Sequence, residues 1–160
     1  MIQLGTILKV VDNSSVREIR CIKVIKGSVA AQGDRILGTV YRLRNIPSGK
    51  EAIVASKASA ALAAQKQKGI QSAFLKGDIV SAVVVRTKKA VDRSRGIGKG
   101  SHKQTGIKLS FPNENAVILI VNSKTTPGVD PMASRSKGPI TPIISSKGYT
   151  KLLSLGSSLI

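Results

Sequence analysis

Apolar and polar residues cluster or alternate over short distances along this chain, a pattern that predicts strands rather than long helices. The clearest example is the stretch 81–89, where small and β-branched residues run unbroken from Ala82 to Val85 and cations follow directly. Such a run is typical of a buried strand. We therefore expect a strand over Ile79–Thr87 that anchors a small β-barrel, with a basic loop leaving its end.

Other segments of the chain also carry strand patterns. The first ends at Asp12–Ser15, a turn signal, because these side chains hydrogen-bond nearby backbone groups. The second alternates imperfectly, as expected for a strand that curls within a small barrel. The last two predict a hairpin across Pro112–Asn115. These segments are residues 6–11, 19–26, 35–44, 107–111 and 116–121. Together they predict a mainly β fold, a small barrel, in a single domain spanning residues 1–160.

Two of the predicted strands begin after the same dipeptide. Gly33-Asp34 precedes the strand over 35–44, and Gly77-Asp78 precedes the anchoring strand. Glycine supplies a left-handed turn, and the aspartate can cap it. We interpret them as two similar turns and not as catalytic carboxylates, which would need a converging geometry that no sequence shows.

Two segments depart from the strand pattern. Residues 48–75 form an Ala/Lys-rich insertion of good helix formers whose helical face is only weakly apolar, so we predict an inserted loop or helix. Near the C-terminus, Lys147–Leu155 predicts a short helical element that plugs one end of the barrel. Leu152 and Leu155 would then face inward at i, i+3 spacing.

Charge is the extreme feature of the composition. The chain has 26 Lys and Arg against 8 Asp and Glu, a formal net charge of +18. A folded domain with this excess repels itself unless a polyanion neutralises it, and nucleic acid is favoured over an anionic membrane because the only helix candidate is alanine-rich. Aromatic residues make up only 2% of the chain, which favours recognition of backbone and shape over base stacking. Apolar residues make up 41%, which excludes a disordered polybasic tail, and no apolar run reaches the length of a membrane span.

Few residues suit catalysis or metal binding. Cys21 is the only cysteine, which excludes an intramolecular disulfide or a paired-cysteine zinc site, and we expect it to be a small buried hydrophobe. His102 is the only histidine and makes a poor metal site by itself. The sequence Gly98–Ser101 lacks the spacing of a nucleotide-phosphate loop. We predict no catalytic residue, no cofactor and no metal.

The candidate RNA contacts are cations at strand ends and in loops. The basic loop over 88–108 also holds glycines, which let a backbone approach phosphates closely. Cations that bind phosphates release counterions, so the expected affinity falls with salt. A second basic edge follows Asp12, and the strand over 35–44 is expected to extend the same rim. The candidates are Arg17, Arg20, Lys23, Arg42, Arg44, Arg86, Lys88, Lys89, Arg93, Arg95, Lys99, Lys103 and Arg135.

Short motifs occur along the chain in an order that resembles the universal large-subunit ribosomal protein fourteen family. They are Met1-Ile2-Gln3, Val11-Asp12-Asn13-Ser14, Cys21-Ile22-Lys23-Val24, Gly33-Asp34, Lys76-Gly77-Asp78, Ala82–Lys89, Phe111, Ala116–Leu119, Gly138-Pro139-Ile140 and Lys147-Gly148-Tyr149. The resemblance covers nearly the whole chain except roughly residues 49–74. The chain departs from the family at Ser15, usually Gly, at Glu114, usually Asn or Thr, and in its longer basic loop. Pro142–Ser146 replaces a charged Glu-Leu-Arg stretch, so the family's first C-terminal helical turn is not carried over.

The resemblance implies a small closed five-stranded barrel with a short C-terminal helical element. It also implies a non-catalytic structural protein of the large ribosomal subunit. The implied partners are large-subunit ribosomal RNA, neighbouring large-subunit proteins, small-subunit RNA across an intersubunit bridge, and a silencing factor that can cap the protein, with no membrane insertion. The insertion and the Lys147-Gly148-Tyr149 ending resemble an organellar, mitochondrial member working in the mitochondrial matrix, with plastid or bacterial cytoplasm as alternatives. From the residues alone, a free nucleic-acid chaperone or translation factor of oligonucleotide-binding type is the alternative function.

Overall fold

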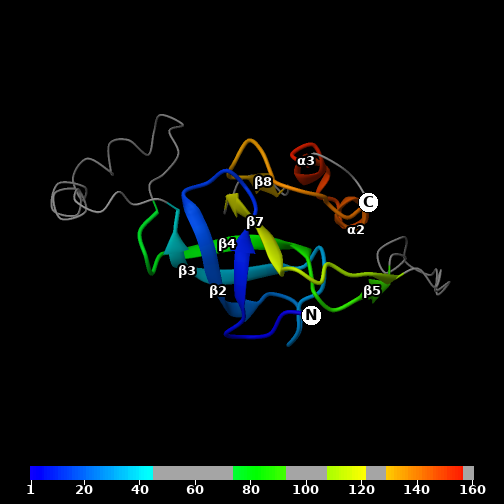
Figure 1. Cartoon of the computed structure of the whole chain (residues 1–160), viewed down its shortest axis with the longest axis horizontal. Helices are drawn as coiled ribbons and strands as arrows, with labels where there is room; N and C mark the ends of the chain where they lie inside the picture. The colour runs from blue at the N-terminus through cyan, green and yellow to red at the C-terminus, as the bar shows by residue number, and fades with distance from the viewer. Residues whose placement is uncertain (45–73, 93–107, 122–128, 157–160) are drawn as a thin grey trace, which may run out of the picture.

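The computed structural model of the chain describes residues 1–44, 74–92, 108–121 and 129–156 (Figure 1). These ranges are mainly β, and both helices are short and close to the C-terminus. The strands are β1 (Ile7–Val10), β2 (Val16–Val24), β3 (Arg35–Leu43), β4 (Ile79–Arg86), β5 (Val91–Asp92), β6 (Lys108–Leu109), β7 (Ala116–Val121) and β8 (Asp130–Pro131), and the helices are α2 (Ile143–Ser146) and α3 (Thr150–Leu153). The predicted insertion over 48–75 lies outside the described residues except for its last two positions.

Five of these strands close into a barrel, as predicted. Antiparallel pairings join β1 to β2, β2 to β3, β3 to β4 and β4 to β7. A parallel pairing then returns β7 to β1, with Lys9 opposite Ala116 and Val10 opposite Val117. β8 continues along β7 beyond β1, with Ile120 opposite Pro131. Closure removes the free strand edges that a small open sheet would expose.

The interior of the barrel is filled by aliphatic side chains from all five strands. Leu8, Ile19, Ile36, Ala82 and Leu119 are fully buried there. Cys21 joins this core with 2% of its surface exposed, which confirms the prediction of a buried hydrophobe. Because alternate residues of a strand face opposite sides, the same strands present a second set of side chains outward.

The helices cover the outside of the barrel and do not plug its end, so that prediction was wrong. Outward side chains of β4 and β7, including Val83, Val85 and Ile118, form a second buried cluster with Ile144 and Leu152. In Figure 1, α2 and α3 lie beside β7 and β8, outside the ring of strands. The physical reason is that β4 and β7 are apolar on both faces and need a cover on each.

The predicted hairpin between residues 107–111 and 116–121 is also wrong. β6 pairs with β5, forming a separate two-stranded sheet with Val91 opposite Leu109 (Figure 1). β7 instead pairs with β4 and β1. The short connection over Pro112–Asn115 suggested a hairpin, but burial of β7 between two barrel strands outweighs that local preference.

The two Gly-Asp turns have the same geometry, as predicted. Gly33 and Gly77 have φ values of +79° and +99°, in the region that favours glycine. In one turn the Ala31 amide donates to Asp34 Oδ2 at 2.7 Å, and in the other the Leu75 amide donates to Asp78 Oδ2 at 2.8 Å. Each aspartate therefore caps the turn that begins its strand.

The C-terminal segment forms one more helical turn than expected. α2 occupies Ile143–Ser146, the stretch for which the family's helical turn was not carried over. Burial of Ile143 and Ile144 stabilises this turn without the usual charged residues. α3 follows, with Leu152 fully buried and Leu155 packed against the cluster outside β4 and β7, whereas the prediction directed both side chains toward the barrel end. Within the described ranges, no helix has the length and apolar character needed to cross a membrane.

Candidate nucleic-acid interface

The outer face of β2 and β3 carries three of the predicted RNA contacts. Arg20 and Arg42 are exposed, and their guanidinium carbons lie 4.9 and 5.4 Å from the ring centre of Tyr41. Glu18 pairs with Arg42 at 3.6 Å. Lys23 is exposed near the end of β2. Cation–π contacts hold the two guanidinium groups close to one aromatic ring while solvent still reaches them.

A buried aspartate fixes the turn between β1 and β2. Asp12 is fully buried, and it accepts the Ser14 amide through Oδ1 and the Leu119 amide through Oδ2, each at 2.9 Å. The neighbouring Asn13 donates its side-chain amide to Ser134 Oγ at 3.1 Å. These bonds bring Arg135, which is exposed, beside the β1–β2 turn although it lies more than a hundred residues later.

Arg44 lies against the same turn, but its side chain is bonded to the backbone of the barrel. Its guanidinium donates to the carbonyl oxygens of Asp12, at 2.7 Å, and of Val10. The Arg44 amide also donates to the Ser15 carbonyl at 2.7 Å. Arg44 therefore closes the barrel rim by hydrogen bonds to backbone, and its contact with RNA stays a prediction.

Arg86, at the end of β4, is more buried than any other predicted contact that the structure describes. A β-bulge between Val84 and Arg86 turns its side chain toward the connection that follows β8. Only 8% of the residue is exposed. Its guanidinium pairs with Glu114 Oε1 at 2.9 Å and donates to the Lys137 carbonyl at 2.7 Å. Burial lowers the pKa of Arg86, and the carboxylate of Glu114 opposes that shift.

A glycine lies opposite the Arg86 guanidinium. Gly138 has a φ of +81°, and a Cβ built on it would lie 2.8 Å from a terminal nitrogen of Arg86. A side chain at position 138 would be strained by the positive φ and would require the Arg86 guanidinium to shift. The guanidinium is thus held between the 137–138 backbone on one side and Glu114 on the other.

Glu114 bridges two strands of the barrel. Its second oxygen, Oε2, lies 3.3 Å from Lys9 Nζ. The register explains this bridge, because Ala116 lies between Lys9 on β1 and Arg86 on β4. Around the bridge lies a surface pocket of about 460 Å³, lined by Lys9, Val10, Val11, Arg17, Arg44, Arg86, Glu114, Lys137 and Gly138. We call it the Arg86 pocket.

Lys88 and Lys89 lie just beyond β4 and are both exposed. The Lys88 amide donates to Asn115 Oδ1 at 2.9 Å, and Thr87 Oγ1 donates to the Lys89 carbonyl at 2.9 Å. Their backbone is therefore fixed while their ammonium groups meet solvent, which is the arrangement that a phosphate contact needs.

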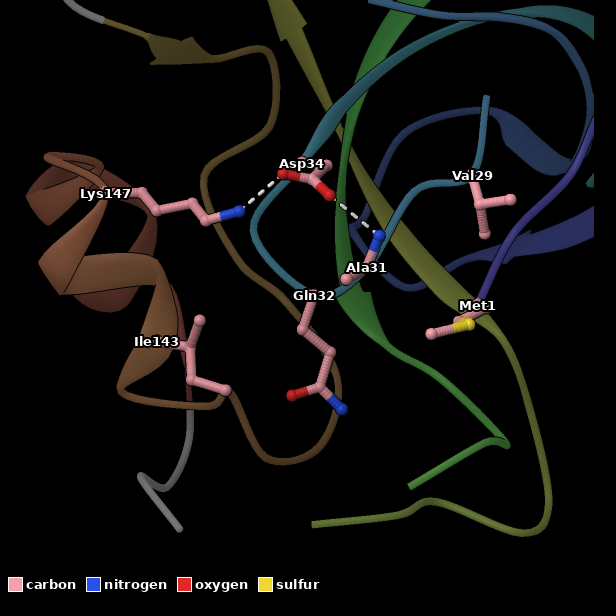
Figure 2. A pocket seen from close by; sticks show the side chains of 7 residues that line it. All are labelled: Met1, Val29, Ala31, Gln32, Asp34, Ile143 and Lys147. Carbon is pink, nitrogen blue, oxygen red and sulfur yellow. Dashed lines mark hydrogen bonds and ion pairs between the residues drawn. The ribbon is translucent and has the colours of Figure 1, made fainter. Parts of the chain in front are cut away.

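A second pocket lies near the N-terminus, and Figure 2 shows its lining. Lys147, at the end of α2, forms an ion pair with Asp34, whose other oxygen accepts the Ala31 amide. Gln32 is 1% exposed, and its side-chain amide donates to Thr87 Oγ1 at 3.1 Å. The pocket, about 280 Å³, is thus the seam where the helical segment is tied to the start of β3.

The structure brings some predicted contacts together and leaves others apart. Arg17 lies in the Arg86 pocket with Arg44 and Arg86, whereas the remaining described contacts lie elsewhere on the barrel. Arg93, Arg95, Lys99 and Lys103 lie outside the described residues, as does His102. Sequence reasoning did not select Lys9, Glu114 or Lys137. Glu114 had been noted only as a departure from the family, and its carboxylate in a strongly cationic chain was a second signal that could have directed attention to it.

The described residues offer no group of three histidine, cysteine or acidic side chains that could hold a metal ion.

A family model described as ribosomal protein L14p/L23e matches residues 1–160, the full sequence. Proteins of this family are structural, non-enzymatic components of the large ribosomal subunit. The barrel with its short C-terminal helices agrees with that assignment. The chain therefore belongs to the ribosomal L14 family.

Proposed function

We propose that the chain binds large-subunit ribosomal RNA through exposed cations that contact backbone phosphates. The observation that carries the proposal is the net charge of +18 on a folded barrel. Internal ion pairs leave much of this charge uncompensated: Arg17, Lys88, Lys89 and Arg135 are exposed and join none of the ion pairs among the described residues. Ribosomal RNA supplies the neutralising charge within the subunit.

Phosphates are favoured over bases as the groups recognised. Among the described residues, Tyr41 is half-buried and contacts two arginines, while Phe74, Phe111 and Tyr149 are half-buried elsewhere. Readers of single-stranded RNA usually expose several aromatic platforms. The proposed contacts therefore set the position of the protein on folded RNA and do not read a sequence.

The finer parts of the proposal follow the family. We propose that the protein lies at the subunit interface, where it contributes to an intersubunit bridge with small-subunit RNA and can be capped by a silencing factor. Exposed Leu4 and Ile79, with 65% and 71% of their surface accessible, supply apolar area for a neighbouring large-subunit protein. We also propose the mitochondrial ribosome as its location. A cryo-electron map of the native particle tests all of these placements at once.

RNA binding is tested by titrating deproteinised large-subunit ribosomal RNA at several salt concentrations. We expect the logarithm of the binding constant to fall linearly with the logarithm of salt concentration, with a slope of about −4 or steeper. The double substitution Lys88→Gln/Lys89→Gln should weaken the slope by about two. The matched control is Lys26→Gln/Lys76→Gln, which removes two other exposed lysines. Binding without salt dependence, or equal effects of the two pairs, would contradict the proposed contacts.

A further inference from the structure

The Arg86 pocket concentrates positive charge around one carboxylate. Lys9, Arg17, Arg44, Arg86 and Lys137 line it, and Glu114 is its one acidic lining residue. Arg17 and Lys137 are exposed and take part in none of the ion pairs described in the structure. The pocket therefore keeps a large excess of positive charge even with Glu114 in place, and it is open to solvent.

Arg86 needs an anion beside it in every state of the folded protein. It is 92% buried, and the Lys137 carbonyl and the glycine at 138 fix its guanidinium in place. Its Nε is buried and has no hydrogen-bond partner within the described residues. Burial of a cation without a paired anion is strongly destabilising. The Arg86 guanidinium therefore keeps its position when other groups in the pocket move, and a negatively charged group has to remain in contact with it.

Glu114 is the part of this pair that can move. Its side chain is 21% exposed and belongs to the turn over Pro112–Asn115. Backbone bonds hold that turn: the Glu114 amide donates to the Phe111 carbonyl at 3.3 Å, and the Lys9 amide donates to the Asn115 carbonyl at 2.9 Å. Neither bond uses the carboxylate, so the Glu114 side chain can rotate away while the turn stays intact.

We propose that the carboxylate of Glu114 occupies the position of an RNA backbone phosphate and gives way to that phosphate on binding. Its two oxygens reach Arg86 at 2.9 Å and Lys9 at 3.3 Å, a bridge that two phosphate oxygens can replace. Arg17 and Lys137 then contact the incoming group from the rim, and Arg44 adds charge from a fixed position. This inference rests on the proposed RNA binding and assigns one phosphate to one site.

The test compares two glutamates that each pair with an arginine. Glu114→Gln removes the competing carboxylate inside the pocket, whereas Glu18→Gln makes the same charge change beside Arg42 on the outer face of β2 and β3. We expect Glu114→Gln to bind deproteinised large-subunit ribosomal RNA about five-fold tighter, the factor for an ion pair that no longer has to be broken. Glu18→Gln should change affinity less than two-fold, roughly the effect of a weak surface pair. The midpoint of thermal unfolding should fall by about ten degrees in Glu114→Gln, because Arg86 keeps only a neutral partner.

A second pair of variants keeps the proposal testable if Glu114→Gln does not fold. Arg17→Gln/Lys137→Gln changes exposed side chains alone and should weaken RNA binding about ten-fold, with a salt slope reduced by about two. Lys26→Gln/Lys76→Gln is the control with the same charge change. Equal effects of Glu114→Gln and Glu18→Gln, or of the two double variants, overturn the phosphate exchange while RNA binding stands. Absence of RNA binding by the unsubstituted protein overturns the proposed function and this inference together.

Discussion

The strands β4 and β7 form a wall of the barrel that is buried on both faces, whereas β1, β2 and β3 form a wall whose outer face meets solvent. We call them the covered wall and the open wall. In the covered wall, every residue from Ala116 to Ile120 is buried, alternately inside the barrel and under the helices. In the open wall, buried and exposed residues alternate along most of β2.

This difference separates the stability of the fold from the proposed recognition of RNA. Both faces of the covered wall pack against apolar side chains, and this packing stabilises the fold in proportion to the apolar area removed from water. The open wall uses its inner face for packing and carries Arg20, Lys23 and Arg42 on its outer face. Arg86 is the exception, a cation of the covered wall, and it is also the one that needs an internal carboxylate. β4, the strand that the sequence pattern indicates most clearly, is therefore chiefly structural.

The largest effect should separate the outer faces of the two walls. Ile118→Ala empties a fully buried site under the helices and should lower the free energy of unfolding by about 3 kcal/mol. Ile7→Ala, on the outer face of β1 with 44% of its surface exposed, should cost less than about 1 kcal/mol. Urea unfolding of both variants measures the difference. Similar losses would mean that the helices do not cover β7.

The apolar run from Ala82 to Val85 correctly indicated a buried strand, but it did not show what covers the two faces of that strand. That periodicity holds no information on the covering element, so α3 was placed at the barrel end although it packs on β7. The parallel pairing of Lys9 with Ala116 joins residues far apart in the chain, and the short turn before Ala116 predicted a hairpin instead.

The sequence predicted which types of residue form the candidate site. It did not predict the surroundings of each side chain in the folded protein. Arginines that follow strands are reasonable phosphate ligands, and the sequence does not show which of them serve the interior. Arg44 donates to two backbone carbonyls, and Arg86 is buried against Glu114, because the barrel closure brings distant segments against their side chains. Exposure and pairing depend on that tertiary arrangement, so no local pattern reports them.

An intermediate effect should distinguish the two Gly-Asp turns. Asn at either aspartate keeps an oxygen that can accept the capping amide, so only the charge is lost. Asp34 also pairs with Lys147 at the end of α2, whereas the structure shows Asp78 on an exposed turn. Asp34→Asn should therefore lower stability by about 1 kcal/mol, and Asp78→Asn by less than half of that.

Thermal or urea unfolding of these variants measures the contrast, and Lys147→Met supplies the control. If Asp34 and Lys147 act as a pair, the double variant Asp34→Asn/Lys147→Met should lose little more than either single variant. Fully additive losses would show that the ion pair seen in Figure 2 does not tie the helical segment to the barrel.

The smallest effect concerns the inner face of the open wall. Burial raises the pKa of the Cys21 thiol above its ordinary value of about 9, against the opposing hydrogen bond from the Lys23 backbone. The folded protein then keeps the proton where the unfolded chain has lost it. This contribution to stability is fully present below pH 9 and disappears as the pH rises through the raised pKa of the folded state.

Urea unfolding from about pH 8 to 10.5 should show a steeper loss of stability in the unsubstituted protein than in Cys21→Ala. The expected difference grows by at most about 1.4 kcal/mol per pH unit, because one proton is involved. A thiol reagent should also label Cys21 only as fast as the barrel opens. Parallel pH curves with rapid labelling would mean that solvent reaches the inner face of β2. Solvent would then reach both faces of the open wall. The difference from β4 and β7 would therefore extend to the barrel interior and would not be limited to the outer surface.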